Sequence, residues 1–146
     1  MIAARLATLA SSLFTGAAIY INLVEHPARR QAGTQLALTE FAPSYHRATV
    51  MQVPLAVLGF VSAIGAWRSS TDIRWLIGGG ALVAVIPFTA LAIMPTNRQL
   101  LDPATAHDPE RAEQLLVQWG RLHAVRSIAS LASLLLFLFL LGQRRN

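Results

Sequence analysis

The chain alternates long apolar stretches with short polar ones, and four of the apolar stretches contain no charged residue. They cover residues 6–24, 48–67, 75–97 and 127–143, which are 19, 20, 23 and 17 residues long. A helix that crosses the roughly 30 Å hydrocarbon core of a bilayer needs about 20 apolar residues. The first three stretches are long enough by themselves, and the fourth needs residues from its N-terminal flank. The pattern predicts four transmembrane helices.

We therefore expect an all-α fold, an integral membrane four-helix bundle forming a single transmembrane domain over residues 1–146. The expected helices cover about residues 4–26, 44–67, 74–95 and 109–142. Asp108 has the character of a helix N-cap, and Pro109 that of a first helical residue. The fourth helix is expected to begin there, to be about 50 Å long and to extend beyond the bilayer at its N-terminal end.

Three prolines mark expected irregularities. Pro27 is expected to kink or end the first helix, because a proline ring disrupts the hydrogen bonding of a helix interior. Pro43 is expected to open the second helix, which leaves residues 28–43 as a loop with one short surface helix. Pro87 is expected to kink the third helix.

The composition supports a membrane protein and excludes several classes of function. Hydrophobic residues make up 54% of the chain and charged residues 13%, which leaves too little polar surface for a soluble domain of 146 residues. The absence of cysteine excludes disulfides and thiolate chemistry. The first apolar stretch ends in Glu25-His26-Pro27, which is not a signal-peptide cleavage site, so we expect this helix to be retained.

The net charge of +5 rests on arginine alone, since the chain has no lysine. The arginines are spread between the apolar stretches, which is typical of membrane-edge anchors and not of a nucleic-acid-binding surface. Their density is highest in the segments expected on one face: Arg5, Arg68, Arg74, Arg144 and Arg145. Because short arginine-rich segments stay in the cytoplasm, we expect a multi-pass protein of the bacterial inner membrane with both termini cytoplasmic.

All four histidines fall on the other face of the expected bundle, with six of the seven acidic residues. The histidines are His26, His46, His107 and His123. The first and third loops of a four-helix membrane protein lie on one side, so the titratable chemistry is concentrated there. His107 lies in a polar loop and is expected to be solvated only.

The sharpest candidate site lies at the start of the fourth apolar stretch. Trp119, His123, Arg126 and Ser130 follow one another at spacings that place them on one helix face. An ionisable residue at membrane depth usually faces the bundle interior and finds a partner. The alternative is that Arg126 extends to the membrane surface and that Trp119 belongs to the aromatic belt.

Partners for this stripe are expected at the ends of the other helices. Glu25 or the Asn97 amide is expected to hold Arg126, with His26 and His46 at a similar depth. Asn22 and Gln52 lie one to two turns deeper. Such a pocket combines an apolar floor with bases, a carboxylate and an arginine, which suits proton removal from an apolar acid and stabilisation of the anion.

A metal or haem site is the alternative use of the same residues. His26, His46 and His123 with Glu25 would supply three imidazoles and a carboxylate. The ligands come from three helices without HxH or HExxH spacing, so the sequence does not specify this site. Gly78-Gly79-Gly80 lacks the lysine and hydroxyl residue of a nucleotide-binding loop.

Three segments resemble the anthrone oxygenase-like family of small membrane proteins. They are Val24-Glu-His-Pro-Ala-Arg29, Met94-Pro-Thr-Asn-Arg-Gln-Leu100 and Trp119-Gly-Arg-Leu-His-Ala-Val-Arg126. The resemblance covers nearly the whole chain, including the four-helix pattern. It implies a small integral membrane protein, and the named fungal members resemble enzymes that oxidise anthrones to anthraquinones with dioxygen. Most bacterial members have no assigned function.

The first functional hypothesis is a membrane-embedded oxygenase for an anthrone- or quinone-like substrate that enters from the lipid, with no cofactor. His123 or His26 would be the base, oriented by Glu25. Arg126 and Asn97 would stabilise the oxyanion, and Trp119 would line the entrance. His46, Asn22 and Gln52 complete the expected substrate-binding set.

The second hypothesis is a non-catalytic membrane subunit of a larger complex, with or without bound haem or copper. In that case the histidines are structural or ligate the cofactor. The sequence favours no nucleic-acid partner, and it leaves a homo-oligomer and a partner membrane subunit open.

Overall fold

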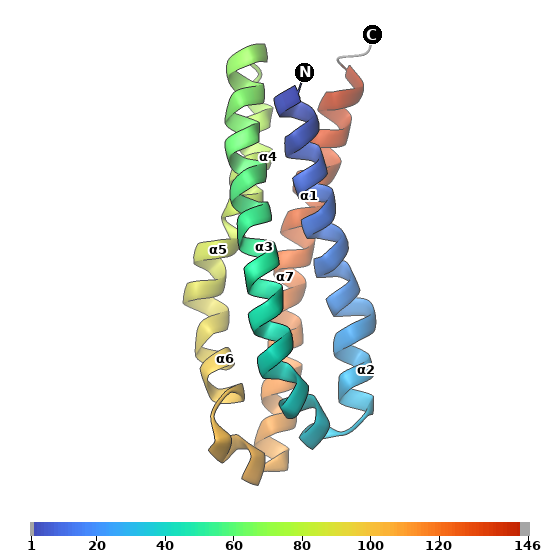
Figure 1. Cartoon of the computed structure of the whole chain (residues 1–146), viewed down its shortest axis with the longest axis vertical. Helices are drawn as coiled ribbons and strands as arrows, with labels where there is room; N and C mark the ends of the chain where they lie inside the picture. The colour runs from blue at the N-terminus through green and yellow to red at the C-terminus, as the bar shows by residue number, and fades with distance from the viewer. Residues whose placement is uncertain (1, 144–146) are drawn as a thin grey trace.

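Four helical spans make up residues 2–143, the part of the chain that a computed structural model describes (Figure 1). The second span is the single helix α3 (Thr34–Ser70), and the fourth is the single helix α7 (Pro109–Gln143). The first span joins α1 (Ile2–Tyr20), η1 (Ile21–Glu25) and α2 (His26–Gln31). The third joins α4 (Arg74–Val83), α5 (Val85–Phe88), η2 (Thr89–Ile93) and α6 (Met94–Leu100). A short 3-10 helix, η3 (Pro103–His107), precedes α7.

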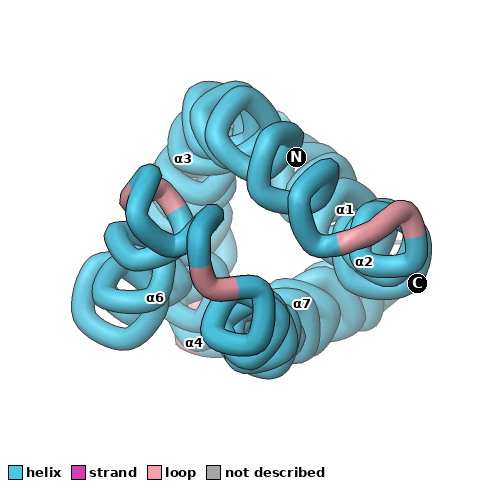
Figure 2. Tube along the Cα trace, turned by 90° about the horizontal axis from the view of Figure 1, so that it is seen from below, coloured by secondary structure: helices cyan, strands magenta, loops and turns pink. Residues whose placement is uncertain are grey.

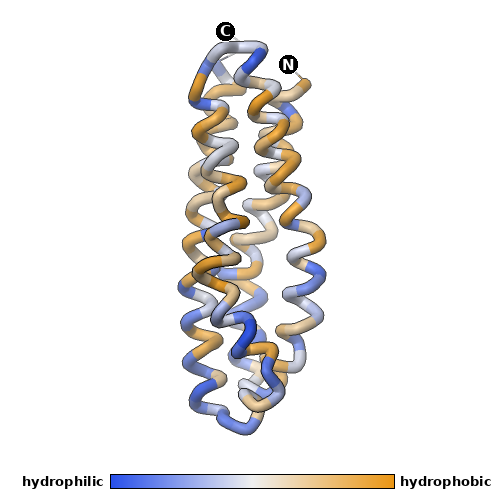
Figure 3. Tube along the Cα trace, turned by 90° about the vertical axis from the view of Figure 1, so that its left-hand side faces the viewer, coloured by the Kyte–Doolittle hydropathy of each residue, from blue (hydrophilic) through white to orange (hydrophobic). Residues whose placement is uncertain are grey.

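The all-α four-helix prediction is confirmed, and so is the long N-terminal extension of the fourth helix. All four spans are long and apolar enough to cross a membrane, counting only the residues described, which fits an integral membrane protein. Seen along the bundle, the spans surround a common axis (Figure 2). Hydrophilic positions gather at the end opposite to the termini (Figure 3). The arginines Arg144 and Arg145 lie outside the described residues, and the orientation in the membrane stays a prediction.

The expected loop over residues 28–43 is wrong, because helix α3 begins at Thr34 and contains Pro43 in its interior. Ala37 and Phe41 are completely buried and belong to a core that also contains Leu115 and Leu116 of α7. Burial of these side chains stabilises the first turns of α3. This gain exceeds the cost of the one backbone hydrogen bond that Pro43 cannot donate. The second span therefore extends beyond a bilayer core as the fourth does.

Each composite span contains one π-helical turn, and each turn ends two residues before a proline. The amide of His26 donates to the carbonyl of Ile21, and the amide of Met94 donates to that of Thr89. Both bonds skip five residues instead of four, just before Pro27 and Pro95. The wider turn accommodates a proline ring that would collide with the carbonyl four residues earlier. The first span therefore continues through Pro27, which lies in the first turn of α2.

Candidate functional site

A cavity of about 160 Å³ lies between the spans, where the apolar half of the bundle meets its polar end. Most of its wall is apolar or aromatic. The polar side chains in the wall include Arg29, Ser44, Gln52, Trp119, His123 and Arg126. The π turn η2 contributes Thr89 and Ala90, and η1 contributes Ile21. Both irregular turns therefore border the cavity, as π turns often do at functional sites.

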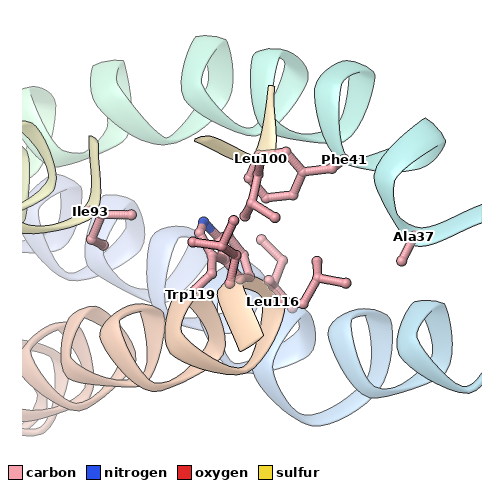
Figure 4. Packing of buried hydrophobic residues seen from close by; sticks show 8 residues of the cluster. Ala37, Phe41, Ile93, Leu100, Leu116 and Trp119 are labelled. Atoms are coloured by element: carbon pink, nitrogen blue, oxygen red, sulfur yellow. The ribbon is translucent and has the colours of Figure 1, made fainter. Parts of the chain in front are cut away.

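Trp119 is a buried residue of the cavity wall and not a member of an aromatic belt. Its indole nitrogen donates a hydrogen bond of 2.9 Å to Oδ1 of Asn97. Its ring packs against the imidazoles of His26 and His123, at centroid distances of 4.9 Å and 4.7 Å, and against the edge of Phe41. Figure 4 shows it projecting from α7 among the labelled core residues. Trp119 thus anchors the wall, and the expectation that it lines the entrance is wrong.

His123 is 2% exposed and lines the cavity. Its Nδ1 lies 2.7 Å from Oδ1 of Asn22. Asn22 does not itself line the cavity; its amide also contacts the carbonyl of Gly120 and the hydroxyl of Ser127. The predicted substrate-binding role of Asn22 is therefore replaced by a contact with His123.

His26 is buried too, but it is not part of the cavity wall. Its Nε2 lies 2.9 Å from the carbonyl oxygen of Leu116. The ring approaches α7 closely, since a Cβ atom on Gly120 would come within 2.8 Å of Nε2. Gly120 was not among the site residues predicted from the sequence. A glycine inside a long helix is nevertheless a usable signal, because it is unfavourable there and often marks a close approach of this kind.

Arg126 reaches the cavity without a carboxylate partner in the described part of the chain. Its Nη2 donates to Oε1 of Gln52 at 2.6 Å, and its guanidinium lies 5.7 Å from the centre of the Phe14 ring. The expectation that Glu25 or Asn97 holds Arg126 is wrong. Asn97 accepts from Trp119, and Glu25 has other partners. A positive charge in the cavity wall whose contacts among the described residues are all neutral favours binding of an anion.

Glu25 belongs to an ion-pair cluster that joins the first span to α3 and includes two residues of the cavity wall, Arg29 and Ser44. Arg29 donates to Glu25 one turn away, and Ser44 donates to the same carboxylate at 2.6 Å. Arg29 also lies 3.5 Å from a carboxylate oxygen of Glu40. Because the first span stays helical through Pro27, Glu25 and Arg29 share one helix face and pair. Among the described residues no hydrogen bond joins the Glu25 carboxylate to the imidazole of His26 or His123, so its expected role in orienting a base is not supported.

The two other histidines lie away from the cavity. His46 is exposed on α3, because the residues of α3 that line the cavity follow a face formed by Tyr45, Thr49 and Gln52. A residue next to Tyr45 is rotated by about 100° from that face. His107 is exposed at the end of η3. The described residues contain no group of three or more His, Asp or Glu side chains placed to hold a metal ion. His26, His46 and His123 therefore do not form the three-histidine site considered above.

The chain is similar to several characterised proteins and to one family. The family described as anthrone oxygenase matches residues 41–136. An "Anthrone oxygenase" of Claviceps purpurea is 31% identical over 138 residues, covering 85% of this chain and 76% of that protein. "Anthrone oxygenase tpcL" of Aspergillus fumigatus is 29% identical, covering 84% and 82%. "Anthrone oxygenase ptaC" of Pestalotiopsis fici is 30% identical, covering 68% and 80%. No solved structure matches the chain.

Proposed function

The chain belongs to the anthrone oxygenase family, and from this premise we propose that it is a membrane-embedded oxygenase for an apolar, anthrone- or quinone-like aromatic substrate. One observation carries the proposal. His123 and Arg126, which have no carboxylate partner in the described part of the chain, line the same largely apolar cavity. A base and a fixed positive charge are the two groups needed to turn a neutral carbon acid into a stabilised anion.

The first step is the removal of a proton from carbon. An anthrone carries a CH₂ group across the central ring from its carbonyl group. Nε2 of His123 takes one of these protons, and the electron pair of the broken C–H bond moves through the ring system to the carbonyl oxygen. Arg126, oriented by Gln52, stabilises the resulting enolate oxygen. Asn97 is engaged by Trp119 and acts through the position of that ring.

The second step is the reaction of the enolate with dioxygen. One electron passes to dioxygen, the two radicals combine, and a C–O bond forms at the deprotonated carbon. The peroxide takes back the proton from His123. Loss of water then breaks the O–O bond and the second C–H bond and leaves a carbonyl group. Anthrone and dioxygen thus give anthraquinone and water, and the atoms and electrons balance without a further reductant or a cofactor.

We propose that the substrate enters from the lipid phase through the side of the cavity between α3 and η2. Thr49 and Val53 of α3 and Ala90 of η2 line the cavity and are exposed at the surface of the bundle. Trp119 and His123 in the same wall are buried. An exposed wall within the membrane-spanning part of the bundle faces lipid, where an apolar aromatic compound is concentrated.

We further propose that the protein lies in a bacterial inner membrane with both termini in the cytoplasm, which places the cavity near the outer surface. The chain has no native cysteine, so single cysteines report the orientation cleanly. In intact cells a membrane-impermeant maleimide should label His107→Cys, and it should label Ser70→Cys only after the membrane is opened. The reverse pattern would show the opposite orientation.

The alternative of a haem- or copper-binding subunit requires histidines that converge. Nε2 of His26 is engaged by the carbonyl of Leu116, and His46 is exposed. These contacts support an oxygenase over a cofactor-binding subunit. The optical spectrum and metal content of the purified protein distinguish the two, because a Soret band or stoichiometric copper would favour the subunit.

The direct test is the conversion of anthrone by purified protein in lipid nanodiscs, followed by anthraquinone absorbance and dioxygen uptake and corrected for the uncatalysed reaction. His123→Ala is expected to lower kcat by about 100-fold or more, which is the usual contribution of a general base. His46→Ala is the matched control, since His46 is exposed outside the cavity, and it should keep the activity of the wild type. Equal rates for the wild type and His123→Ala would exclude the mechanism.

A further inference from the structure

The orientation of the Asn22 amide is determined by its surroundings. Its Nδ2 lies 3.1 Å from the carbonyl oxygen of Gly120, which can only accept a hydrogen bond. The amide nitrogen must therefore face Gly120, and Oδ1 must face the other way. The hydroxyl of Ser127 lies 2.5 Å from this oxygen and donates to it. Both ends of the amide are thus assigned by chemistry, without reference to hydrogen positions.

The same amide oxygen determines which nitrogen of His123 carries hydrogen. Oδ1 of Asn22 lies 2.7 Å from Nδ1 of His123 and has no hydrogen to donate. Nδ1 must therefore be the donor. A neutral imidazole has a single N–H group, so Nε2 carries the lone pair. Among the described residues Nε2 has no hydrogen-bond partner, and the ring lines the cavity.

His26 provides an internal comparison, because the structure assigns it the opposite tautomer. Its Nε2 must donate to the carbonyl of Leu116, which leaves the lone pair on Nδ1. That nitrogen is buried without a partner in the described part of the chain, and His26 is not in the cavity wall. The two imidazoles that contact Trp119 thus differ in protonation pattern, and of the two residues only His123 lines the cavity.

We propose that Asn22 is a positioning residue that holds His123 in the tautomer able to take a proton from the substrate. The inference rests on the proposed function for the role of His123 as the base. In the other tautomer two lone pairs would face each other across 2.7 Å, and Nε2 would carry a hydrogen where a base is needed. Asn22 thus raises the fraction of protein molecules in which Nε2 of His123 can accept a proton, and it does so without contacting the substrate.

The test is direct observation of the tautomer by NMR on protein with ¹⁵N-labelled histidine in detergent micelles. Long-range ¹H–¹⁵N correlations distinguish the two tautomers, and the signals of His123 are those lost in His123→Ala. The wild type should show a hydrogen on Nδ1 of His123. Asn22→Leu, which has a similar volume and no hydrogen-bonding group, should show a mixture of tautomers or mainly the Nε2–H form. Its kcat for anthrone should fall by about 10-fold with KM within about twofold, because the ring stays in place while its competent fraction falls.

Ser127→Ala is the control, because it removes the second donor to the Asn22 oxygen and keeps the contact with Gly120. It should retain the wild-type tautomer. Observation of the Nε2–H form in the wild type would overturn the inference even if Asn22→Leu failed to fold. An unchanged tautomer and kcat in a folded Asn22→Leu protein would also overturn it. A wild type with the expected tautomer but no anthrone oxidation would refute the proposed function and leave the assignment of Asn22 standing.

Discussion

The half of the bundle that carries the termini is closed by small residues, whereas the half that carries the histidines is held apart by aromatic and polar side chains. In the first half, a Cβ atom on Gly59 would lie 2.4 Å from Leu82, and one on Gly79 would lie 2.7 Å from Ala63. Helices that approach so closely leave no space between them. In the second half, Trp119 and Phe41 occupy the interior and the cavity lies beside them.

The third span accounts for much of this difference. Its first part, α4, packs against α3 and α7, and the span then bends so that α6 lies away from the line of α4 (Figures 1 and 2). Pro87 and the π turn η2 lie at this bend. The predicted kink is therefore present, and it opens the side of the bundle through which we propose that the substrate enters. The half that carries the termini, the tight half, thus packs closely, and the other half, the open half, contains the cavity and its charged side chains.

The largest effects are expected from substitutions of the two arginines in the cavity wall, Arg126 and Arg29. Arg126→Met removes a charge that has no carboxylate partner among the described residues, so we expect kcat for anthrone to fall by about 100-fold, as for the loss of an oxyanion-stabilising donor. The thermal unfolding midpoint should stay the same or rise, since an uncompensated charge is removed from the interior.

Arg29→Met is the matched variant, and it should behave differently. Arg29 is buried against Glu25, so its removal leaves a carboxylate without its partner. We expect about 2 kcal/mol lower free energy of unfolding, less than for a fully buried pair because Glu25 is partly exposed. A larger loss of stability from Arg126→Met than from Arg29→Met would contradict this assignment of the two charges.

A second test disturbs the tight half alone. A Cβ atom on Gly78 would lie 2.6 Å from the ring of Phe137, which is itself buried and stacked on Trp75. Gly78→Leu should therefore lower the free energy of unfolding by about 3 kcal/mol through overpacking. The activity of the protein that remains folded should be unchanged, as measured by kcat normalised to the folded fraction. Gly80→Leu is the control, since a Cβ atom there meets no atom within 4 Å.

A smaller effect on stability is expected at Gly120, where a glycine makes space for an imidazole and not for a neighbouring helix. Gly120→Ala places a methyl group 2.8 Å from Nε2 of His26, and the ring must move away from the carbonyl of Leu116. The alanine gains about 1 kcal/mol in helix propensity, which partly offsets the clash. We expect the free energy of unfolding to fall by about 1 kcal/mol in total, as measured by thermal unfolding. No loss at all would show that His26 has space to move.

The smallest effect concerns the open side of the cavity. Val53→Trp adds bulk at an exposed position of the wall between α3 and η2. If substrate enters there, KM for anthrone should rise by about threefold to tenfold while kcat changes little. Val57→Trp, one turn further along the exposed face of α3 and outside the cavity wall, should leave KM unchanged. Equal effects of the two substitutions would place the entrance elsewhere.

The order of residues alone predicts the number of spans and the end of the bundle that holds the candidate site. Four charge-free stretches, three of membrane length and a fourth that needs residues from its N-terminal flank, predict four helices, because backbone groups in lipid must be satisfied within each segment. The predicted stripe of Trp119, His123, Arg126 and Ser130 follows from helical periodicity alone. The first three residues line the cavity, whereas Ser130 is buried outside the cavity wall and donates to the carbonyl of Ser127. Both properties depend on local spacing, which the order of residues fully specifies.

The pairing of the polar groups, in contrast, follows from how the helices pack against one another. Arg126 contacts Gln52 and not Glu25, and His123 contacts Asn22 and not a carboxylate. These contacts depend on the rotation of each helix about its own axis, and for Asn22 also on the π turn η1 in which it lies. A change of one residue turns a helix face by about 100°. For this reason His46 faces away from the cavity while Tyr45, its neighbour, lines it.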